Sequence, residues 1–225
     1  MALTEKLYNK MAERYGHDAS WALWNDAHPV DTRIISESLH ELHTRVVMVG
    51  LNISDTIPGT WLNFRDGDKP ARLRRMFNHS NYRGAYMTDL IKGVIAGDSR
   101  EIKRRVKSGG SDRIDMGQHI AAFREEMNLL GVERNALFIL FGNDVTHLFE
   151  DSDLNDLFPN HVTCWHYSFR YKNDAVWHQR VLSDLEDHYC TSKGEYHTPP
   201  LHPSPPASRV KLIKGQFRRD RDTCY

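Results

Sequence analysis

The fold of this chain is decided by the stretch Arg45-Val46-Val47-Met48-Val49-Gly50-Leu51-Asn52-Ile53-Ser54. An apolar, β-branched run of this kind is typical of a strand that is buried on both faces, as in a parallel sheet. The run breaks at Gly50 and leaves one amide, Asn52, at its carboxyl end. Open α/β folds bind ligands at the carboxyl ends of such strands, so we expect Asn52 at a ligand site. The alternative is a residue that only forms the turn, which asparagine favours.

The composition indicates one globular domain. The 225 residues, of which 40% are hydrophobic, suffice for a single substantial core. Three cysteines without CxxC spacing argue against a disulfide framework, a zinc knuckle or a four-thiolate cluster, so we expect neither a metal nor a cofactor. The chain shows no apolar stretch of membrane-spanning length and no signal-peptide pattern. These features predict a monomeric, cytoplasmic protein without a membrane partner.

Apolar periodicity predicts alternating strands and helices along the chain. We expect residues 1–44 to form helices that pack on the core. Strands are predicted at 46–51, 85–90, 136–141 and 161–165, and helices at 72–77, 118–130, 144–149 and 174–189, with a glycine loop at 108–111. Residues 45–190 are thus expected to form a three-layer α/β/α sandwich with a central, mostly parallel four-stranded sheet. Repeated prolines and basic residues predict an extended arm at 191–225.

Four segments follow one another at predicted strand ends: Gly50-Leu51-Asn52, Tyr86-Met87-Thr88-Asp89-Leu90-Ile91-Lys92, Leu140-Phe141-Gly142-Asn143-Asp144 and Trp165-His166-Tyr167-Ser168. In this order they resemble the motifs of the uracil-DNA glycosylase superfamily, over roughly residues 45–190. The resemblance implies that the first motif holds the attacking water and that a later strand reads a flipped base. It also implies that the histidine of the last motif stabilises the departing base and that the following residues wedge into the duplex.

The chain departs from the motifs of that family at two places. Ile53 and Ser54 follow Asn52 where family members usually have Pro and then Gly or Tyr, and Tyr167 replaces the Pro of a His-Pro-Ser motif. A literal His202-Pro203-Ser204 sequence lies in the proline-rich arm with no strand before it, and we interpret it as a coincidence. The cysteine ligands of the iron-sulfur branch of the family are missing, so no cluster is expected.

Hydrolysis of an N-glycosidic bond passes through a cation-like sugar and a base that leaves with negative charge. Asn52 is the candidate that positions the water, and Asp55 is the nearest candidate for a general base, because an amide takes up no proton near neutral pH. His166 is the candidate donor to the leaving base; a satisfied, partly buried imidazole is the alternative. These three residues are the predicted catalytic residues.

Asp89 stands where the resemblance implies an Asn that reads the base. An ionised carboxylate only accepts hydrogen bonds, so it favours the 4-amino group of cytosine over the 4-oxo group of uracil. A cell that removed ordinary cytosine would strip its own genome, so a modified cytosine of phage DNA is the interesting substrate. A protonated Asp89 still reads uracil. The structural alternatives are a cap for the following segment and an ion pair with Lys92.

Aromatic side chains in the loop after Asn52 are candidates to stack on a flipped base, an interaction that contributes about 1–3 kcal/mol. Phe64 is the first candidate and Trp61 the second, and Ser54 completes the predicted substrate-binding residues. Loop aromatics also serve as anchors of a small core, which is the structural alternative.

DNA, double- or single-stranded, is the predicted partner. The 30 basic and 30 acidic residues balance overall, so phosphate contacts must come from local clusters. The candidates lie in a basic segment and in the loop after His166: Arg104, Arg105, Tyr167, Ser168, Phe169 and Arg170. A solvated helix face is the alternative for the basic segment.

The sequence therefore predicts a monofunctional DNA glycosylase that serves base-excision repair of uracil or defence against phage DNA. A serine hydrolase is disfavoured because no G-x-S-x-G elbow is present, and phosphate-loop enzymes are disfavoured because the required glycines are missing. The rival hypothesis is a non-catalytic protein on the same fold that binds nucleic acid or a protein partner. The departures at Ile53 and Tyr167 are its main support.

Overall fold

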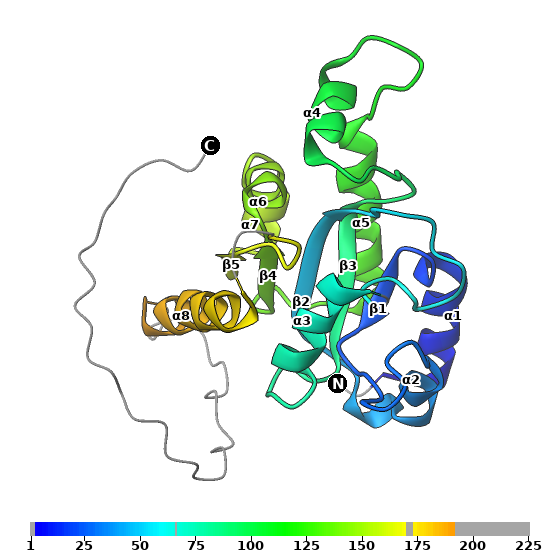
Figure 1. Ribbon diagram of the computed structural model, residues 1–225. Helices are drawn as coiled ribbons and strands as arrows, with labels where there is room; N and C mark the ends of the chain where they lie inside the picture. Colours follow the sequence, from blue (N-terminus) through cyan, green and yellow to red (C-terminus); the bar gives the residue numbers. More distant parts are fainter. Residues whose placement is uncertain (1–2, 66, 170–172, 192–225) are drawn as a thin grey trace, which may run out of the picture.

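Strand β2 (His43–Asn52) lies at the centre of a five-stranded sheet in this computed structural model, which describes residues 3–65, 67–169 and 173–191 (Figure 1). Strands β3 (Ala85–Ile91) and β4 (Leu137–Phe141) pair with β2 on either side, both in parallel. Strand β5 (His161–Cys164) continues the sheet parallel to β4. Strand β1 (Ala19–Trp21) closes the other edge, antiparallel to β3.

The apolar run of β2 is buried on both faces, as the sequence predicts. Val47 and Val49 belong to one hydrophobic cluster, whereas Val46 and Met48 belong to a second cluster on the opposite face. Side chains alternate along a strand, which produces this division. Because helices cover both faces, β2 has no solvated side, and this explains the continuous apolar character of residues 46–51.

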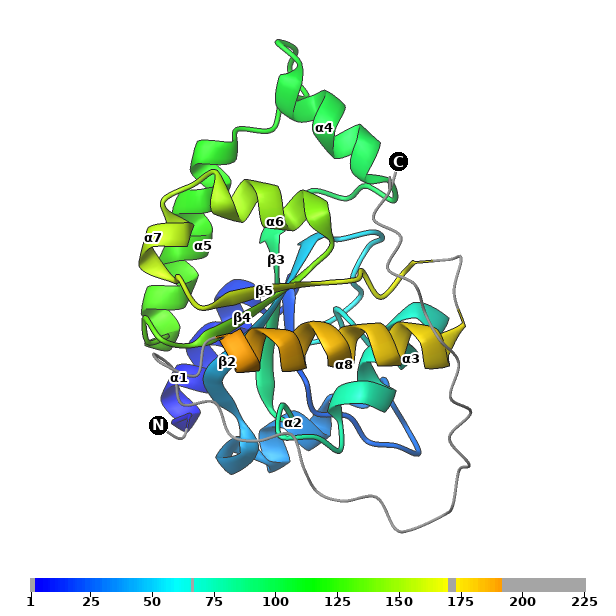
Figure 2. The ribbon, with the colours of Figure 1, turned by 90° about the vertical axis from the view of Figure 1, so that its left-hand side faces the viewer.

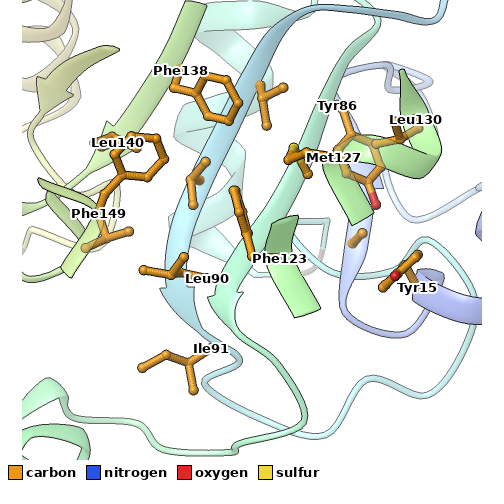
Figure 3. Close-up of a cluster of buried hydrophobic side chains, with 14 of the residues drawn as sticks. Tyr15, Tyr86, Leu90, Ile91, Phe123, Met127, Leu130, Phe138, Leu140 and Phe149 are labelled. Carbon is orange, nitrogen blue, oxygen red and sulfur yellow. The ribbon is translucent and has the colours of Figure 1, made fainter. Parts of the chain in front are cut away.

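Four helices cover the first face of the sheet: α1 (Glu5–Tyr15), α5 (Met116–Leu130), α6 (Asn143–Glu150) and α7 (Leu154–Leu157). Their apolar side chains pack with those of the strands in a cluster that Figure 3 shows in part, with Phe123 of α5 beside the sheet. The ring of Phe123 lies 6.4 Å from that of Phe138 on β4, measured between centroids. Aromatic contacts of this kind join the helical layer to the central strands.

Two helices cover the second face: α3 (Asp68–Phe77) and α8 (Asp174–Thr191) (Figure 2). Trp177 of α8 and Phe77 of α3 are fully buried in the second cluster. The short helices α2 (Arg33–Glu37) and η1 (Leu39–Glu41) precede β2 in the chain. The predicted α/β sandwich with a mostly parallel sheet is confirmed.

The predicted number of strands, four, was wrong, because the sheet has five. Residues 19–21 form β1, with Ala19 opposite Thr88 and Trp21 opposite Tyr86, in a region where we expected helices alone. Three residues are too few for the two-residue period of a strand to stand out in a sequence. Residues 1–44 therefore contribute a strand to the sheet as well as helices.

Helix α4 (Ser99–Lys107) lies in a polar segment where the sequence offered a helix only as the alternative interpretation of its basic residues. The side chain of Asp98 caps the helix by accepting a hydrogen bond from the backbone of Arg100 at 2.8 Å. Ile102 is its buried apolar residue, so no apolar stripe marked the helix in advance. In Figures 1 and 2, α4 projects from the body of the domain beyond the end of β3.

Neither a membrane-spanning helix nor a cluster of metal-ligating side chains occurs among the described residues. None of the helices there combines the length and the apolar character that a membrane crossing requires. Within the same ranges, no group of three or more His, Cys, Asp or Glu side chains is placed to hold a metal ion. The arm predicted at 191–225 lies outside the described residues from position 192 onward.

Candidate active site

Gly50 and Asp89 face each other on neighbouring strands near the carboxyl edge of the sheet. They are partners in the parallel register of β2 and β3. A Cβ atom at position 50 would lie 2.3 Å from Oδ1 of Asp89 and 3.4 Å from Cε1 of Phe64. The break in the apolar run of β2 is therefore the place where a carboxyl group and an aromatic ring lie against the central strand.

The carboxyl group of Asp89 is buried, and only one of its oxygens is satisfied. Oδ2 accepts a hydrogen bond from Nδ2 of Asn63 at 2.8 Å, whereas Oδ1 has no hydrogen-bond partner among the described residues. Burial raises the pKa of Asp89 to about 7, although the Asn63 hydrogen bond and the charge of Lys92 act in the other direction. A buried polar atom without a partner is uncommon and calls for an explanation, such as a ligand that completes it.

Lys92 does not form an ion pair with the carboxyl group of Asp89. Its Nζ lies 2.8 Å from Oε2 of Glu126, a fully buried residue of α5, and donates to the backbone carbonyl of Asp89 at 2.8 Å. Glu126 also accepts hydrogen bonds from the hydroxyl groups of Tyr86 and Thr88, at 2.7 and 3.0 Å. The ion-pair alternative for Asp89 is therefore wrong, and Lys92 belongs to a separate buried network.

Asn63 links the loop after β2 to Asp89. Besides its bond to Asp89, Nδ2 donates to the carbonyl of Asp18 at 2.8 Å, and Oδ1 accepts from the backbone N–H of Phe64 at 3.0 Å. The side chain of Asn63 is buried and holds three parts of the chain together. Sequence reasoning missed this residue, because a single asparagine between two aromatic residues carries no pattern of its own.

The two loop aromatics predicted to stack on a base lie in different places. Phe64 is 4% exposed and approaches Gly50, next to Asp89. Trp61 packs against Tyr8 and Trp21, with ring centroids 5.8 and 6.1 Å apart, in the core cluster of the first face. The structure therefore brings Phe64, and not Trp61, together with Asp89.

The backbone of this loop is strained. Both Trp61 and Phe64 have a φ angle of 62°, in the left-handed region that residues other than glycine rarely adopt. The buried guanidinium of Arg65 secures the loop by donating to the carbonyls of Trp61 and Leu23, at 3.0 and 2.6 Å. Strained conformations of this kind persist where the surrounding structure holds them, and they cluster at functional sites.

His166 follows β5 and lies against Gly142, the residue that follows β4. A Cβ atom at position 142 would lie 3.4 Å from Cβ of His166, and Gly142 itself has a φ of 100°. Nδ1 of His166 accepts a hydrogen bond from the backbone N–H of Ser168 at 3.1 Å and lies 2.7 Å from its hydroxyl oxygen. Because Nδ1 is an acceptor, the proton of the neutral ring lies on Nε2.

His166 is neutral at physiological pH. Burial lowers the pKa of its imidazole to about 4, and the charge of Lys69 adds to this effect while that of Asp144 opposes it. The side chain therefore presents a neutral N–H donor over the pH range in which most proteins work.

Tyr167 connects His166 to Phe64. Its ring stacks on the imidazole of His166, with centroids 4.3 Å apart, and meets Phe64 and Phe141 edge-on at 6.0 and 5.7 Å. Burial, together with the charge of Asp89, raises the pKa of the Tyr167 hydroxyl. The ring thus packs into the protein in this conformation, whereas the sequence assigned it to the group that enters the duplex.

A surface pocket of about 340 Å³ lies beside this cluster. Its lining comes from α3, from the loop after β5 and from the start of α8: Lys69, Arg72, Arg75, Tyr167, Ser168, Phe169 and Asp174. Arg72 donates to the carbonyls of Tyr167 and Phe169 at 3.2 and 2.8 Å and pairs with Asp174 at 2.8 Å. The pocket therefore joins a basic helix to the loop that carries His166.

The loop after β5 carries further DNA-binding candidates. Phe169 is 38% exposed and lies 5.0 Å from the ring of Trp165, so among the described residues of this loop it is the aromatic residue with the exposed ring. Ser168 lines the pocket, and its backbone N–H donates a hydrogen bond to Nδ1 of His166. Arg170 lies outside the described residues.

Asn52, Ser54 and Asp55 lie at the carboxyl end of β2. Nδ2 of Asn52 donates to the carbonyls of Ile53 and Ala96, at 2.7 and 2.8 Å, so its donor group is occupied and Oδ1 is the atom that can receive a ligand. Ser54 and Asp55 are exposed, and Oδ1 of Asp55 accepts from the backbone of Thr56 at 2.7 Å. No described hydrogen bond joins Asp55 to Asp89 or His166.

Arg104 and Arg105 lie on α4, apart from this cluster. The side chain of Arg104 is 67% exposed, and its guanidinium lies 3.8 Å from the carboxylate of Asp112. Arg105 donates to the backbone carbonyl of Asp112 at 3.0 Å and lies 3.9 Å from Glu101. Arg104 thus lies on the exposed side of the helix, where phosphates have access to it, whereas Arg105 is partly buried.

Substitution of Gly50 by alanine is expected to lower the free energy of unfolding by about 2 kcal/mol, because the new methyl group meets Oδ1 of Asp89 at 2.3 Å. Urea unfolding measures the change. Gly109→Ala is the matched control, since a Cβ there meets no atom within 4 Å. Combining Gly50→Ala with Asp89→Ala should recover part of the loss. Equal stability of the Gly50→Ala protein and the wild type would show that this contact is not tight.

Comparison of the chain with protein-family models, with curated proteins and with solved structures gave no match. The functional assignment therefore depends on the chemistry of Asp89, Phe64 and His166 and on how the fold places them.

Proposed function

We propose that this protein is a DNA glycosylase that hydrolyses the N-glycosidic bond of a flipped pyrimidine and leaves an abasic site. One observation carries the proposal. The buried carboxyl group of Asp89, with one oxygen lacking a partner, lies next to the ring of Phe64, and Tyr167 joins that ring to the neutral imidazole of His166. These groups provide a base-reading atom, a stacking surface and a hydrogen-bond donor at one edge of a parallel sheet.

The base would stack on Phe64 and meet Oδ1 of Asp89. Extrusion of a nucleotide requires a few kcal/mol, to be offset by stacking and by hydrogen bonds to the edge of the base. Oδ1 is shielded from solvent, so the base reaches it only when a covering side chain moves. Tyr167 lines the surface pocket and also packs on Phe64, which makes its ring the group that must give way.

The chemistry would follow from three groups. A water held by Oδ1 of Asn52 attacks C1′ of the sugar; the bond between C1′ and the base nitrogen breaks, and its electron pair leaves with the base. Nε2–H of His166 donates to the negatively charged base, and the proton lost by the water passes to solvent or to Asp55. A neutral N–H donor suits this task, because it can stabilise the negative charge that develops on the base by a hydrogen bond, without transferring its proton.

Contacts with the DNA backbone would come from two basic surfaces, α4 and the pocket beside α3. Replacing Lys69 or Arg104 by alanine should reduce the slope of log Kd against log salt concentration by about 0.9 each, because the slope counts neutralised phosphates. Fluorescence anisotropy with labelled DNA measures the slope. Lys6→Ala, an exposed position on α1, is the control and should leave it unchanged. If neither Lys69→Ala nor Arg104→Ala changes the slope, DNA binds elsewhere.

The substrate is proposed to be either uracil, in base-excision repair, or a modified cytosine of phage DNA, in defence. Asp89 supports the modified cytosine, because an ionised carboxylate accepts a hydrogen bond from an amino group. Its pKa of about 7 also keeps uracil as a candidate, because part of the carboxyl group is then protonated at neutral pH. A monomer acting in the cytoplasm, without a cofactor or a metal, completes the proposal.

Mass spectrometry of free bases tests the proposal. Purified protein is incubated with uracil-containing, mismatched and phage-modified DNA, and the released bases are identified. Release of one base with a matching number of abasic sites supports a glycosylase. The rival, a non-catalytic binder, is supported by the packing of Tyr167 over Phe64, and binding of the same DNA without base release would favour it.

A further inference from the structure

We infer that Asp89 reads position 4 of the flipped pyrimidine through one atom, Oδ1, and that the protonation state of this atom decides between an amino group and a carbonyl group. The inference rests on the proposed function, because the proposed function supplies the position of the base beside Asp89. It adds a switch in substrate preference that depends on pH, and it gives Asn63 the role of a positioning residue.

The hydrogen bonds around Asp89 leave a single oxygen for a ligand. Asn63 donates to Oδ2 at 2.8 Å, and its amide is held by the carbonyl of Asp18 and the backbone of Phe64, so it cannot turn its oxygen toward Asp89 without losing these bonds. Oδ2 therefore faces a donor and is the acceptor of the pair. When the carboxyl group takes up a proton, Oδ1 is the oxygen that carries it.

The two charge states of Oδ1 select opposite partners. The ionised oxygen only accepts, so it pairs with the 4-amino group of a cytosine and repels the 4-oxo group of uracil. The protonated oxygen donates to the 4-oxo group of uracil and leaves a cytosine amino group facing a second donor. An unpaired buried donor costs about 1–3 kcal/mol in general, which is enough to discriminate between bases.

The charged groups around Asp89 place the switch near neutral pH. Burial is the largest effect and raises the pKa of Asp89 to about 7; the carboxylates of Asp18 and Glu126 act in the same direction. The Asn63 hydrogen bond and the ammonium group of Lys92 lower it. Tyr167 also senses the charge of Asp89, but its own pKa is raised, so the hydroxyl stays neutral. Lower pH therefore favours uracil, and higher pH favours a cytosine-type base.

Binding of non-cleavable DNA tests the inference without requiring catalysis. Two duplexes carry a 2′-fluoro sugar, which resists hydrolysis, with uracil in one and cytosine or 5-hydroxymethylcytosine in the other. From about pH 6 to about pH 8, we expect Kd to rise about tenfold for uracil and to fall about tenfold for the cytosine-type base. Histidines and phosphate contacts affect both duplexes alike, so the ratio of the two Kd values isolates the base.

Two variants separate the role of Asp89 from a structural role. Asp89→Asn should give a ratio that does not depend on pH, since the amide does not titrate. Asn63→Ala removes a hydrogen bond that favours the ionised form, so the midpoint of the switch should move to higher pH. Far-UV circular dichroism and thermal melting confirm that both variants fold.

Several outcomes would overturn the inference: a ratio independent of pH in the wild type, the same pH dependence in Asp89→Asn, or binding of both duplexes no tighter than a duplex with thymine at the same place. Failure of the proposed function is a different result. It consists of no base release from cleavable DNA at any pH, while the Kd ratio still changes with pH as described.

Discussion

Replacing His166 with alanine is expected to slow base release by about 100- to 1,000-fold, the usual effect of removing one donor from a site that stabilises developing negative charge. Backbone donation from Ser168 makes Nδ1 an acceptor and leaves the proton on Nε2, and burial keeps the pKa of the ring at about 4. The proposed donor therefore carries its proton before any ligand binds. Single-turnover kinetics on a defined oligonucleotide measure the rate.

The pH profile gives a second readout for His166. Because its pKa is lowered, the imidazole stays neutral as the pH falls from about 7 to about 5, so this residue should cause no loss of rate in that range. His166→Gln keeps an amide donor and should lose less rate than His166→Ala. His79→Ala, at a side chain 70% exposed, is the matched control and should keep the rate. A folded His166→Ala protein with the wild-type rate would remove His166 from the mechanism.

Replacing Lys92 with methionine is expected to lower the free energy of unfolding by about 3–5 kcal/mol, the range found when one partner of a buried ion pair is removed. The side chain of Glu126 is 0% exposed and that of Lys92 10%, and their charged atoms lie 2.8 Å apart. Without Lys92, the carboxylate keeps only the hydroxyl groups of Tyr86 and Thr88 as partners. Urea unfolding monitored by tryptophan fluorescence measures the loss.

The double variant distinguishes an uncompensated charge from lost packing. Lys92→Met combined with Glu126→Leu removes both charges and should recover part of the stability, although the hydroxyl groups of Tyr86 and Thr88 then lose their acceptor. Arg14→Met breaks an exposed pair with Glu125 and should leave the unfolding transition nearly where it is. A double variant less stable than Lys92→Met alone would show that the loss of the acceptor for these hydroxyl groups outweighs the relief of the unpaired charge.

Lys92 also bears on the site itself. It donates to the backbone carbonyl of Asp89 and to the hydroxyl of Thr88, so the network on the first face of the sheet holds the strand whose second face carries Asp89. Oε2 of Glu126 has no hydrogen-bond partner among the described residues, so the ion-pair contact with Lys92 is what stabilises this oxygen. Because the charge of Lys92 lowers the pKa of Asp89, we expect Lys92→Met to move the midpoint of the base preference to higher pH as well as to destabilise the fold.

The candidate site could be predicted in part because the end of a buried strand is marked in the sequence, where an apolar run gives way to a polar residue or a glycine. The apolar runs of β2 and β4 end at Asn52 and Gly142, and Asp89 lies two residues before the end of β3; in parallel strands these ends meet at one edge. Asp89 was recognised as a carboxylate in a position where an amide was expected. Its missing hydrogen-bond partner, however, is a property of its surroundings and cannot be read from the residue itself.

Contacts between segments far apart in the chain account for what the sequence did not predict. Asn63 meets Asp89 across 26 residues, and its importance depends on the loop folding back over β2. Tyr167 was expected to enter the duplex because of its place after His166, but the ring packs on Phe64 and Phe141. Trp61 was the second candidate after Phe64 by sequence, and it lies in the core cluster of the other face.

The sequence by itself determined the class of fold, because apolar periodicity is a local property. Each strand of the parallel core consists of apolar residues, so its burial can be predicted from that segment alone. Only the tertiary structure decided which polar side chains share a site and in which charge state. Burial of Asp89 and the approach of Asn63 set the pKa of that carboxyl group, and the backbone of Ser168 sets the tautomer of His166. Desolvation and hydrogen-bond geometry depend on neighbours that only the folded chain brings together.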